Sequence, residues 1–193
     1  MKKTGILIIA LTLIVVICGA FYAVNEKSKK ENQKETVLTE IQKVTTKDLD
    51  RDYPQTPREV IKFYNKIVDC YYKDQYTDDE LDSLTGQALK LFDDELASAN
   101  QQDSYKESVR ADVQNYKDQG KTIAQMDVCD SNDVKYVTDS EDQIAYVRAS
   151  YFIKQDNSYS KTYQEYVLRK DSEEHWKILT FYKIENASDT ESE

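Results

Sequence analysis

Few side chains in this sequence combine the type and the spacing that catalysis usually requires. The only histidine, His175, stands at the beginning of an expected strand, where it could act as a general base, although a solvated strand-end residue is the simpler interpretation. Asp127 lies on one face of another expected strand, together with Ile123, Gln125 and Cys129. It is the best single carboxylate for a pocket. No nucleophile stands at a spacing that predicts a pair with a base, so the sequence predicts a protein that is not an enzyme.

No motif in the sequence has the complete ligand spacing of a metal site. Residues 130–134 begin like a calcium-binding loop, but Val134 then occupies a ligand position, and the required glycine and closing glutamate are missing. Cys18, Cys70 and Cys129 form no CxxC pattern and no cluster with histidine, which argues against a zinc site. We therefore expect no metal and no cofactor. A disulfide between Cys70 and Cys129 and two buried thiols are both open interpretations.

Aromatic residues dominate the composition, with 15 tyrosines against five phenylalanines and one tryptophan. A tyrosine ring is apolar and its hydroxyl is polar, which suits the wall of a cavity. The candidate ligand pocket consists of Tyr64, Asp127, Tyr151, Tyr166 and Trp176. Burial of the same aromatic side chains in an ordinary core is the alternative.

Length and charge limit the classes of protein that the chain can belong to. Its 193 residues suffice for one domain and an appendage, and its formal net charge is −10. An acidic protein repels phosphate backbones, so we expect no nucleic-acid partner.

The first 55 residues have the pattern of a membrane anchor followed by a tether. Residues 6–24 form an uncharged, apolar run behind Lys2 and Lys3, and a run of this length can cross a bilayer as a helix. We expect a cytoplasmic tail at residues 1–5, a transmembrane signal-anchor at residues 6–24 and an extracytoplasmic C-terminal part. A cleaved signal peptide ending near Cys18 and a lipoprotein signal are the alternatives. Residues 25–55 are expected to form a polar tether.

The folded domain is expected at residues 56–185, beginning with helices and followed by a disordered acidic tail at residues 186–193. Thr56 and Glu59 predict a capping box for a helix that continues to Tyr72. A second capping box at Thr77 opens a helical segment that continues to residue 96, with an interruption near Gly86. A third at Ser104 opens a helix to residue 116, and Gly120 closes it.

From residue 122 the hydrophobic period changes to two, which predicts strands at residues 122–129, 134–138, 144–154, 160–170 and 175–184. Helices followed by an antiparallel meander indicate an α+β domain with the helices packed on the sheet. Trp176 is expected to be buried between the last strand and the first helix, on one face with Ile178, Thr180 and Tyr182.

Three sequence segments resemble known families. Residues 45–49 and 53–60 (TTKDL and YPQTPREV) are similar to a family of uncharacterised, single-span, membrane-anchored proteins of Gram-positive bacteria, whose domain has no known function. The closing segment Trp176-Lys177-Ile178, with Phe181 and Tyr182 beyond it, resembles the last strand of the nuclear-transport-factor-2-like (NTF2-like) superfamily. These resemblances imply an NTF2-like cone with a curved antiparallel sheet and a location at the cell membrane, but no activity.

Two classes of function therefore remain open. The first is a non-catalytic module that binds or scaffolds a protein or ligand, with the membrane, another envelope protein or a second copy as partner. The second is a small-molecule pocket or enzyme of the NTF2-like superfamily. An assembly subunit of a secretion or conjugation complex is a specific version of the first class.

Overall fold

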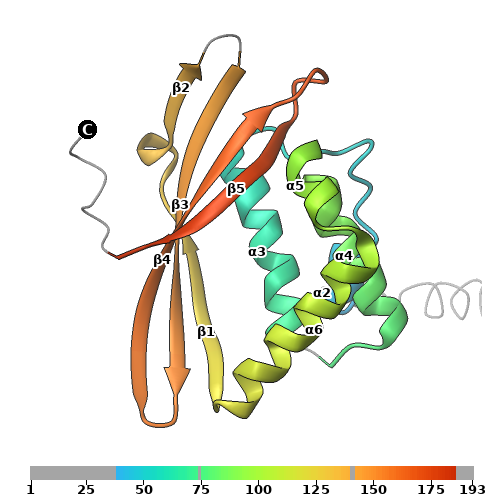
Figure 1. Cartoon of the computed structure of the whole chain (residues 1–193), viewed down its shortest axis with the longest axis vertical. Coiled ribbons are helices and arrows are strands. Elements are labelled where there is room, and N and C mark those ends of the chain that lie inside the picture. Colours follow the sequence, from blue (N-terminus) through green and yellow to red (C-terminus); the bar gives the residue numbers. More distant parts are fainter. Residues whose placement is uncertain (1–37, 74, 140–141, 186–193) are drawn as a thin grey trace, which may run out of the picture. The chain divides into compact units, whose positions relative to one another are not determined.

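The computed structural model describes residues 38–73, 75–139 and 142–185 (Figure 1). The helices are α2 (Glu40–Thr45), α3 (Pro57–Lys73), α4 (Asp78–Leu91), α5 (Asp94–Ala99) and α6 (Gln102–Asp118). The strands are β1 (Lys121–Val128), β2 (Lys135–Asp139), β3 (Asp142–Gln155), β4 (Ser158–Lys170) and β5 (Trp176–Ile184), with a 3-10 turn at Ser131–Asp133. The expected cytoplasmic tail, transmembrane span, first part of the tether (residues 25–37) and acidic tail lie outside the described residues. Within the described ranges, no helix is both long and apolar enough to cross a membrane.

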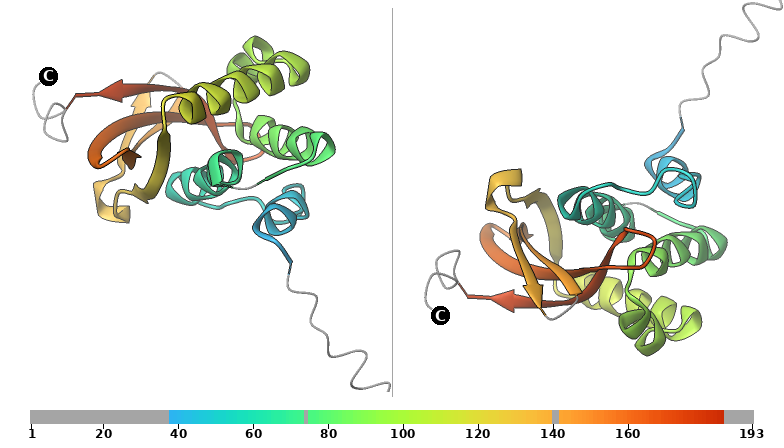
Figure 2. Two further views of the ribbon diagram at one scale, coloured as in Figure 1. Left: turned by 90° about the horizontal axis from the view of Figure 1, so that it is seen from below. Right: turned by 90° about the horizontal axis from the view of Figure 1, so that it is seen from above.

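The five strands form one antiparallel sheet in the order β1-β3-β4-β5. The long strand β3 pairs with β4 along one edge, while its other edge is shared by β1 and β2. Figures 1 and 2 show that the sheet is curved and that the helices lie on one side of it. The structure confirms the predicted α+β class with helices packed on an antiparallel sheet.

Helix α3 begins as its sequence predicts. The Glu59 backbone N–H donates to Thr56 Oγ1 at 3.2 Å, and the Thr56 backbone N–H donates to Glu59 Oε2 at 3.1 Å, which completes the capping box. The apolar stripe of the helix is buried, with Val60, Ile61 and Ile67 fully removed from solvent. This stripe is the surface on which the rest of the domain packs.

The second capping box is confirmed, but the expected interruption of the following helix is wrong. Thr77 and Glu80 cap α4 reciprocally, and the helix then continues through Gly86 to Leu91. A single glycine inside a helix costs only about 1 kcal/mol relative to alanine, and packing of Leu81 and Leu84 outweighs that cost. The helix ends at Leu91, and the next residue, Phe92, forms an isolated β-bridge with Ile178 of β5.

The third capping box, predicted at Ser104, does not form. Helix α6 begins at Gln102, and the Ser104 hydroxyl donates a hydrogen bond to the Gln101 carbonyl. Contacts with α4 explain this earlier start. The Gln102 amide donates to the Asp82 carbonyl at 2.9 Å and to Thr85 Oγ1 at 2.8 Å. The predicted end is confirmed, since Gly120 follows the helix with φ of 62°.

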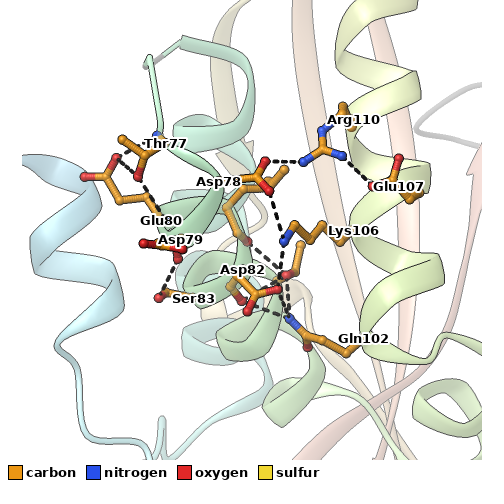
Figure 3. Close-up of polar contacts among 12 residues, drawn as sticks. Thr77, Asp78, Asp79, Glu80, Asp82, Ser83, Gln102, Lys106, Glu107 and Arg110 are labelled. Atoms are coloured by element: carbon orange, nitrogen blue, oxygen red, sulfur yellow. Dashed lines mark hydrogen bonds and ion pairs between the residues drawn. The ribbon is translucent and has the colours of Figure 1, made fainter.

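Charged side chains add to the contact between α4 and α6 (Figure 3). Lys106 lies 3.1 Å from Asp82 and 3.6 Å from Asp78, and Arg110 pairs with Asp78 and Glu107. The carboxylates are largely exposed, so these pairs contribute little individually. Together with Gln102 they fix the position of α6, which forms one wall of the cleft described below.

The folded unit begins at Thr39, so the predicted tether is wrong for residues 39–55. Helix α2 buries Ile41 and Val44, and the loop after it buries Leu49 and Tyr53. Helix α4 also contacts this segment, because the Gln87 amide donates hydrogen bonds to the backbone carbonyls of residues 45 and 47. The composition of this segment is polar on average, but its apolar residues Ile41 and Val44 lie at the spacing of one helix face.

A bulge in β1 changes the face on which Asp127 lies. The register passes from Ile123 paired with Ile153 to Gln125 paired with Phe152, so Ala124 is an extra residue. An extra residue shifts the side-chain alternation by one. The expectation that Ile123 and Asp127 share a face is therefore wrong.

A second bulge, in β5, means that the residues expected on one face with Trp176 lie on two different faces. Thr180 pairs with Val167 and Ile178 pairs with Leu168, which leaves Leu179 as the extra residue. Beyond the bulge, Phe181 takes the inner face. Thr180 and Tyr182 therefore do not share the face of Trp176 and Ile178, contrary to the expectation.

Candidate functional site

A cleft of about 300 Å³ lies between α3, α6 and the inner face of the sheet. We call it the tyrosine cleft, because seven tyrosines line it: Tyr64, Tyr71, Tyr72, Tyr105, Tyr116, Tyr151 and Tyr166. The helices provide the first five and the strands β3 and β4 provide the last two. Its size is at the lower end of the range for small-ligand sites.

Hydroxyl groups on the sheet side of the cleft form a connected network. The Tyr166 hydroxyl lies 2.7 Å from Gln164 Oε1 and 2.5 Å from the Tyr151 hydroxyl. The Tyr151 hydroxyl donates to Asn65 Oδ1 of α3 at 2.9 Å. This network joins the helix to the sheet at the floor of the cleft, and it keeps both rings in fixed orientations.

On the helix side, the hydroxyl groups are less completely bonded. The Tyr64 and Tyr105 hydroxyls are 3.5 Å apart, and the Tyr72 hydroxyl donates to the Asp112 carboxylate. The Tyr71 hydroxyl is buried near that of Tyr105, but no group among the described residues has the distance and angle of a full hydrogen bond to it. A buried hydroxyl without a partner costs about 1–3 kcal/mol, so this group would gain from a bound ligand.

Aromatic rings give the cleft an apolar interior. The Tyr64 and Tyr166 rings meet edge to face with centroids 5.9 Å apart, and the Phe181 ring lies 5.4 Å from that of Tyr166. Phe181 is 38% exposed although it faces the cleft, which leaves part of the aromatic lining open to solvent. A ligand that covered this ring would bury apolar surface.

Burial controls the ionisation of these tyrosines. It raises the pKa of Tyr64, Tyr71, Tyr105 and Tyr166, and it raises the pKa of Tyr151 to about 12. All five phenols are therefore neutral at physiological pH, so they offer hydrogen bonds rather than a phenolate base. Among the residues that line the cleft, Asp112 is the only carboxylate.

Three of the five predicted pocket residues, Tyr64, Tyr151 and Tyr166, line the cleft together. The other two do not line it. Asp127 is exposed and accepts a hydrogen bond from the Gln125 amide at 2.7 Å, because the bulge at Ala124 turns it outward.

Trp176 is buried as expected, at 7% exposure, but it is the first residue of β5, whereas the cleft residue Phe181 lies further along the strand, beyond the bulge. The Trp176 ring meets that of Tyr136 in β2 edge to face, with centroids 5.7 Å apart. Its side chain therefore belongs to the core and is not part of the cleft.

Sequence reasoning missed the contribution of α6. Tyr105, Val109, Asp112 and Tyr116 all line the cleft, and their spacing places them on one helix face. The spacing was visible in the sequence, but it does not distinguish a cleft wall from a core face. Only the position of α6 beside α3 and the sheet makes that distinction.

His175 lies in a structural turn. Its ring stacks on Tyr53 with centroids 4.3 Å apart, and its Nδ1 is 3.5 Å from the Glu173 carboxylate and 3.9 Å from that of Asp171. Asp171 Oδ1 accepts hydrogen bonds from the backbone N–H groups of Glu173 and His175 and so closes the turn. These contacts support the interpretation of His175 as a strand-end residue.

Cys70 and Cys129 are thiols in the structure, and no disulfide joins them. In the part of the chain that the structure describes, no group of three or more His, Cys, Asp or Glu side chains could hold a metal ion. Residues 131–133, within the segment that begins like a calcium-binding loop, form a 3-10 turn.

The fold and the cleft define the class of protein: an α+β domain with a small aromatic cleft between its helices and its sheet. The chain belongs to the family described as Domain of unknown function (DUF6715), whose model matches residues 1–181. No curated protein matches the chain.

Proposed function

We propose that this protein is a non-catalytic binding module, held at the outer side of the cell membrane by residues 6–24, with the tyrosine cleft as its ligand site. The length and the absence of charge in residues 6–24 support the anchor. Helices packed on a curved antiparallel sheet support an NTF2-like cone for the domain.

The observation that carries the proposal is the cleft of neutral tyrosines, in which the Phe181 ring is partly exposed and the buried Tyr71 hydroxyl forms no full hydrogen bond with the described residues. Neutral phenols around one carboxylate, Asp112, which accepts from the Tyr72 hydroxyl, favour binding over reaction. The ligand that fits is a small molecule with a ring-sized apolar body and at least one hydrogen-bonding group that reaches Tyr71.

A blocking substitution tests the cleft. Ser108→Trp on α6 would place an indole in the cleft, whereas Ala111→Trp adds the same group to an exposed position on the same helix. In a thermal-shift screen of small aromatic alcohols and amides, ligands should stabilise the wild type and Ala111→Trp but not Ser108→Trp. Equal stabilisation of all three proteins would place the ligand elsewhere and contradict the proposal.

Fractionation tests the membrane location separately. The full-length chain should stay with membranes after alkaline carbonate extraction, and added protease should digest its C-terminal part in cells with an intact membrane. Release by carbonate, or protection from protease, would contradict this part of the proposal.

A further inference from the structure

A second groove, of about 540 Å³, lies between the helix α3 and the edge of β1 that faces away from β3. Five consecutive β1 residues, 124–128, line this groove. Because side chains alternate between the two faces of a strand, a continuous run of lining residues means that the backbone edge itself forms the wall. Among the described strands, β1 pairs only with β3, so this edge carries backbone N–H and C=O groups available for a further strand.

The opposite wall of the groove carries four basic residues and one acid, Asp69, although the chain as a whole has a net charge of −10. The other acid that lines the groove is Asp127 on the β1 wall, which accepts from the Gln125 amide. Arg58, Lys62 and Lys66 follow one another at four-residue spacing along α3, and all three line the groove. Arg58 is engaged by the Cys129 carbonyl at 2.6 Å. Lys62 and Lys66 are exposed and form no ion pair with the described residues, whereas Lys73 further along pairs with Asp69 at 2.8 Å.

A buried polar group lies between these walls. Asn65 lines the groove, is 6% exposed and has an Nδ2 atom without a hydrogen-bond partner among the described residues. Its Oδ1 is occupied by the Tyr151 hydroxyl, so the amide can offer only its N–H groups to a ligand. An acceptor oxygen in the groove would satisfy a donor that is otherwise left unpaired.

We infer that this groove binds an extended acidic peptide segment of a partner protein, which adds to β1 as a further antiparallel or parallel strand. An extended peptide supplies alternating N–H and C=O groups that match a strand edge, and this mode is common in peptide recognition. Acidic side chains on the face toward α3 would pair with Lys62 and Lys66, and a peptide carbonyl would accept from Asn65.

Charge argues against a second copy of this chain as the occupant. Two copies joined through β1 would bring two sets of Lys62 and Lys66 together in one groove, which is unfavourable. The lysines could also serve only to keep the edge from pairing with other chains, as charged residues do on many edge strands. The experiment below distinguishes these cases.

The test is a fluorescence-anisotropy titration of the full-length chain, in a mild nonionic detergent, with a short labelled peptide in which glutamate and valine alternate. Lys62→Glu/Lys66→Glu should weaken binding at least about tenfold. Lys117→Glu/Lys154→Glu changes the net charge equally at exposed positions outside the groove and should leave affinity within about twofold. Hydrogen exchange should slow at residues 124–128 when the peptide binds, but not in β5.

Several results would overturn the inference. Equal weakening in both double variants would mean a general charge effect. Binding without slower exchange at residues 124–128 would exclude strand addition. Absence of binding by the wild type, with self-association of Lys62→Glu/Lys66→Glu, would mean that the lysines only protect the edge.

Discussion

The Tyr53 hydroxyl donates a hydrogen bond of 3.1 Å to the backbone carbonyl of Trp176, a residue 123 positions away in the sequence. This bond ties the segment before α3 to the first residue of the last strand. The Lys177 ammonium lies 4.4 Å from the centroid of the Tyr53 ring and strengthens the same junction. The segment therefore belongs to the domain energetically as well as geometrically.

Removing this bond should lower stability. Tyr53→Phe keeps the ring and removes the hydroxyl, so the free energy of unfolding should fall by about 0.5–1.5 kcal/mol. Tyr159→Phe is the matched control, because Tyr159 is 58% exposed and its loss of a hydroxyl should change stability by less than about 0.5 kcal/mol. Denaturant unfolding measures both, and equal effects would mean that the bond to Trp176 contributes nothing.

The cap of α3 should also be measurable. Thr56→Ala removes the oxygen that accepts from the Glu59 N–H, and we expect a loss of about 1 kcal/mol in the free energy of unfolding. Thr56→Ser retains an equivalent oxygen and should remain close to the wild type. If alanine and serine behave alike in denaturant unfolding, the hydroxyl is not a stabilising cap.

Burial of Trp176 predicts both a spectrum and a stability change. Its intrinsic fluorescence should be blue-shifted and poorly quenched by acrylamide in the folded protein, because the side chain is 7% exposed. Trp176→Ala should cost roughly 3–5 kcal/mol through lost packing with neighbours that include Tyr136. A red-shifted, readily quenched emission would instead indicate an exposed tryptophan.

The tyrosine cleft should make the protein sensitive to alkaline pH. An unfolded tyrosine has a pKa of about 10, whereas burial raises the pKa of Tyr151 to about 12 in the folded protein. Between these values the unfolded state binds fewer protons than the folded state, so the free energy of unfolding falls as pH rises. Below about pH 9 this contribution is fully present.

Denaturant unfolding at a series of pH values measures that slope. Tyr151→Phe removes one such group, so the decline between about pH 10 and 12 should be shallower by up to about 1.4 kcal/mol per pH unit. An identical slope in the wild type and the variant would show that Tyr151 ionises equally well in both states.

Local signals in the sequence were sufficient for much of the fold. The capping boxes at Thr56 and Thr77 and the closing Gly120 involve residues within a few positions of one another, so the sequence alone predicts them. The box at Ser104 failed because the Gln102 amide bonds to α4, a contact that local sequence does not contain.

The bulge in β1 explains one of the two errors at the candidate site. Strict alternation predicted an inward Asp127, but the extra residue Ala124 reverses the phase, and nothing in the alternation itself locates that extra residue. Tyr64, Tyr151 and Tyr166 do line one cleft, because all three are large side chains on the faces that α3 and the sheet turn toward each other. Tyr71 was not singled out, because its importance lies in a missing hydrogen-bond partner.

The central claim is that the tyrosine cleft binds a small ring-shaped ligand, and NMR mapping with para-cresol tests it most directly. This probe has one apolar ring and one hydroxyl, the features that the cleft matches. We predict saturable shift changes confined to resonances of cleft residues, with the largest at Tyr71, Tyr105 and Phe181, and their loss in Ser108→Trp but not in Ala111→Trp. Shift changes that are scattered over the surface, or that persist in Ser108→Trp, would contradict the account.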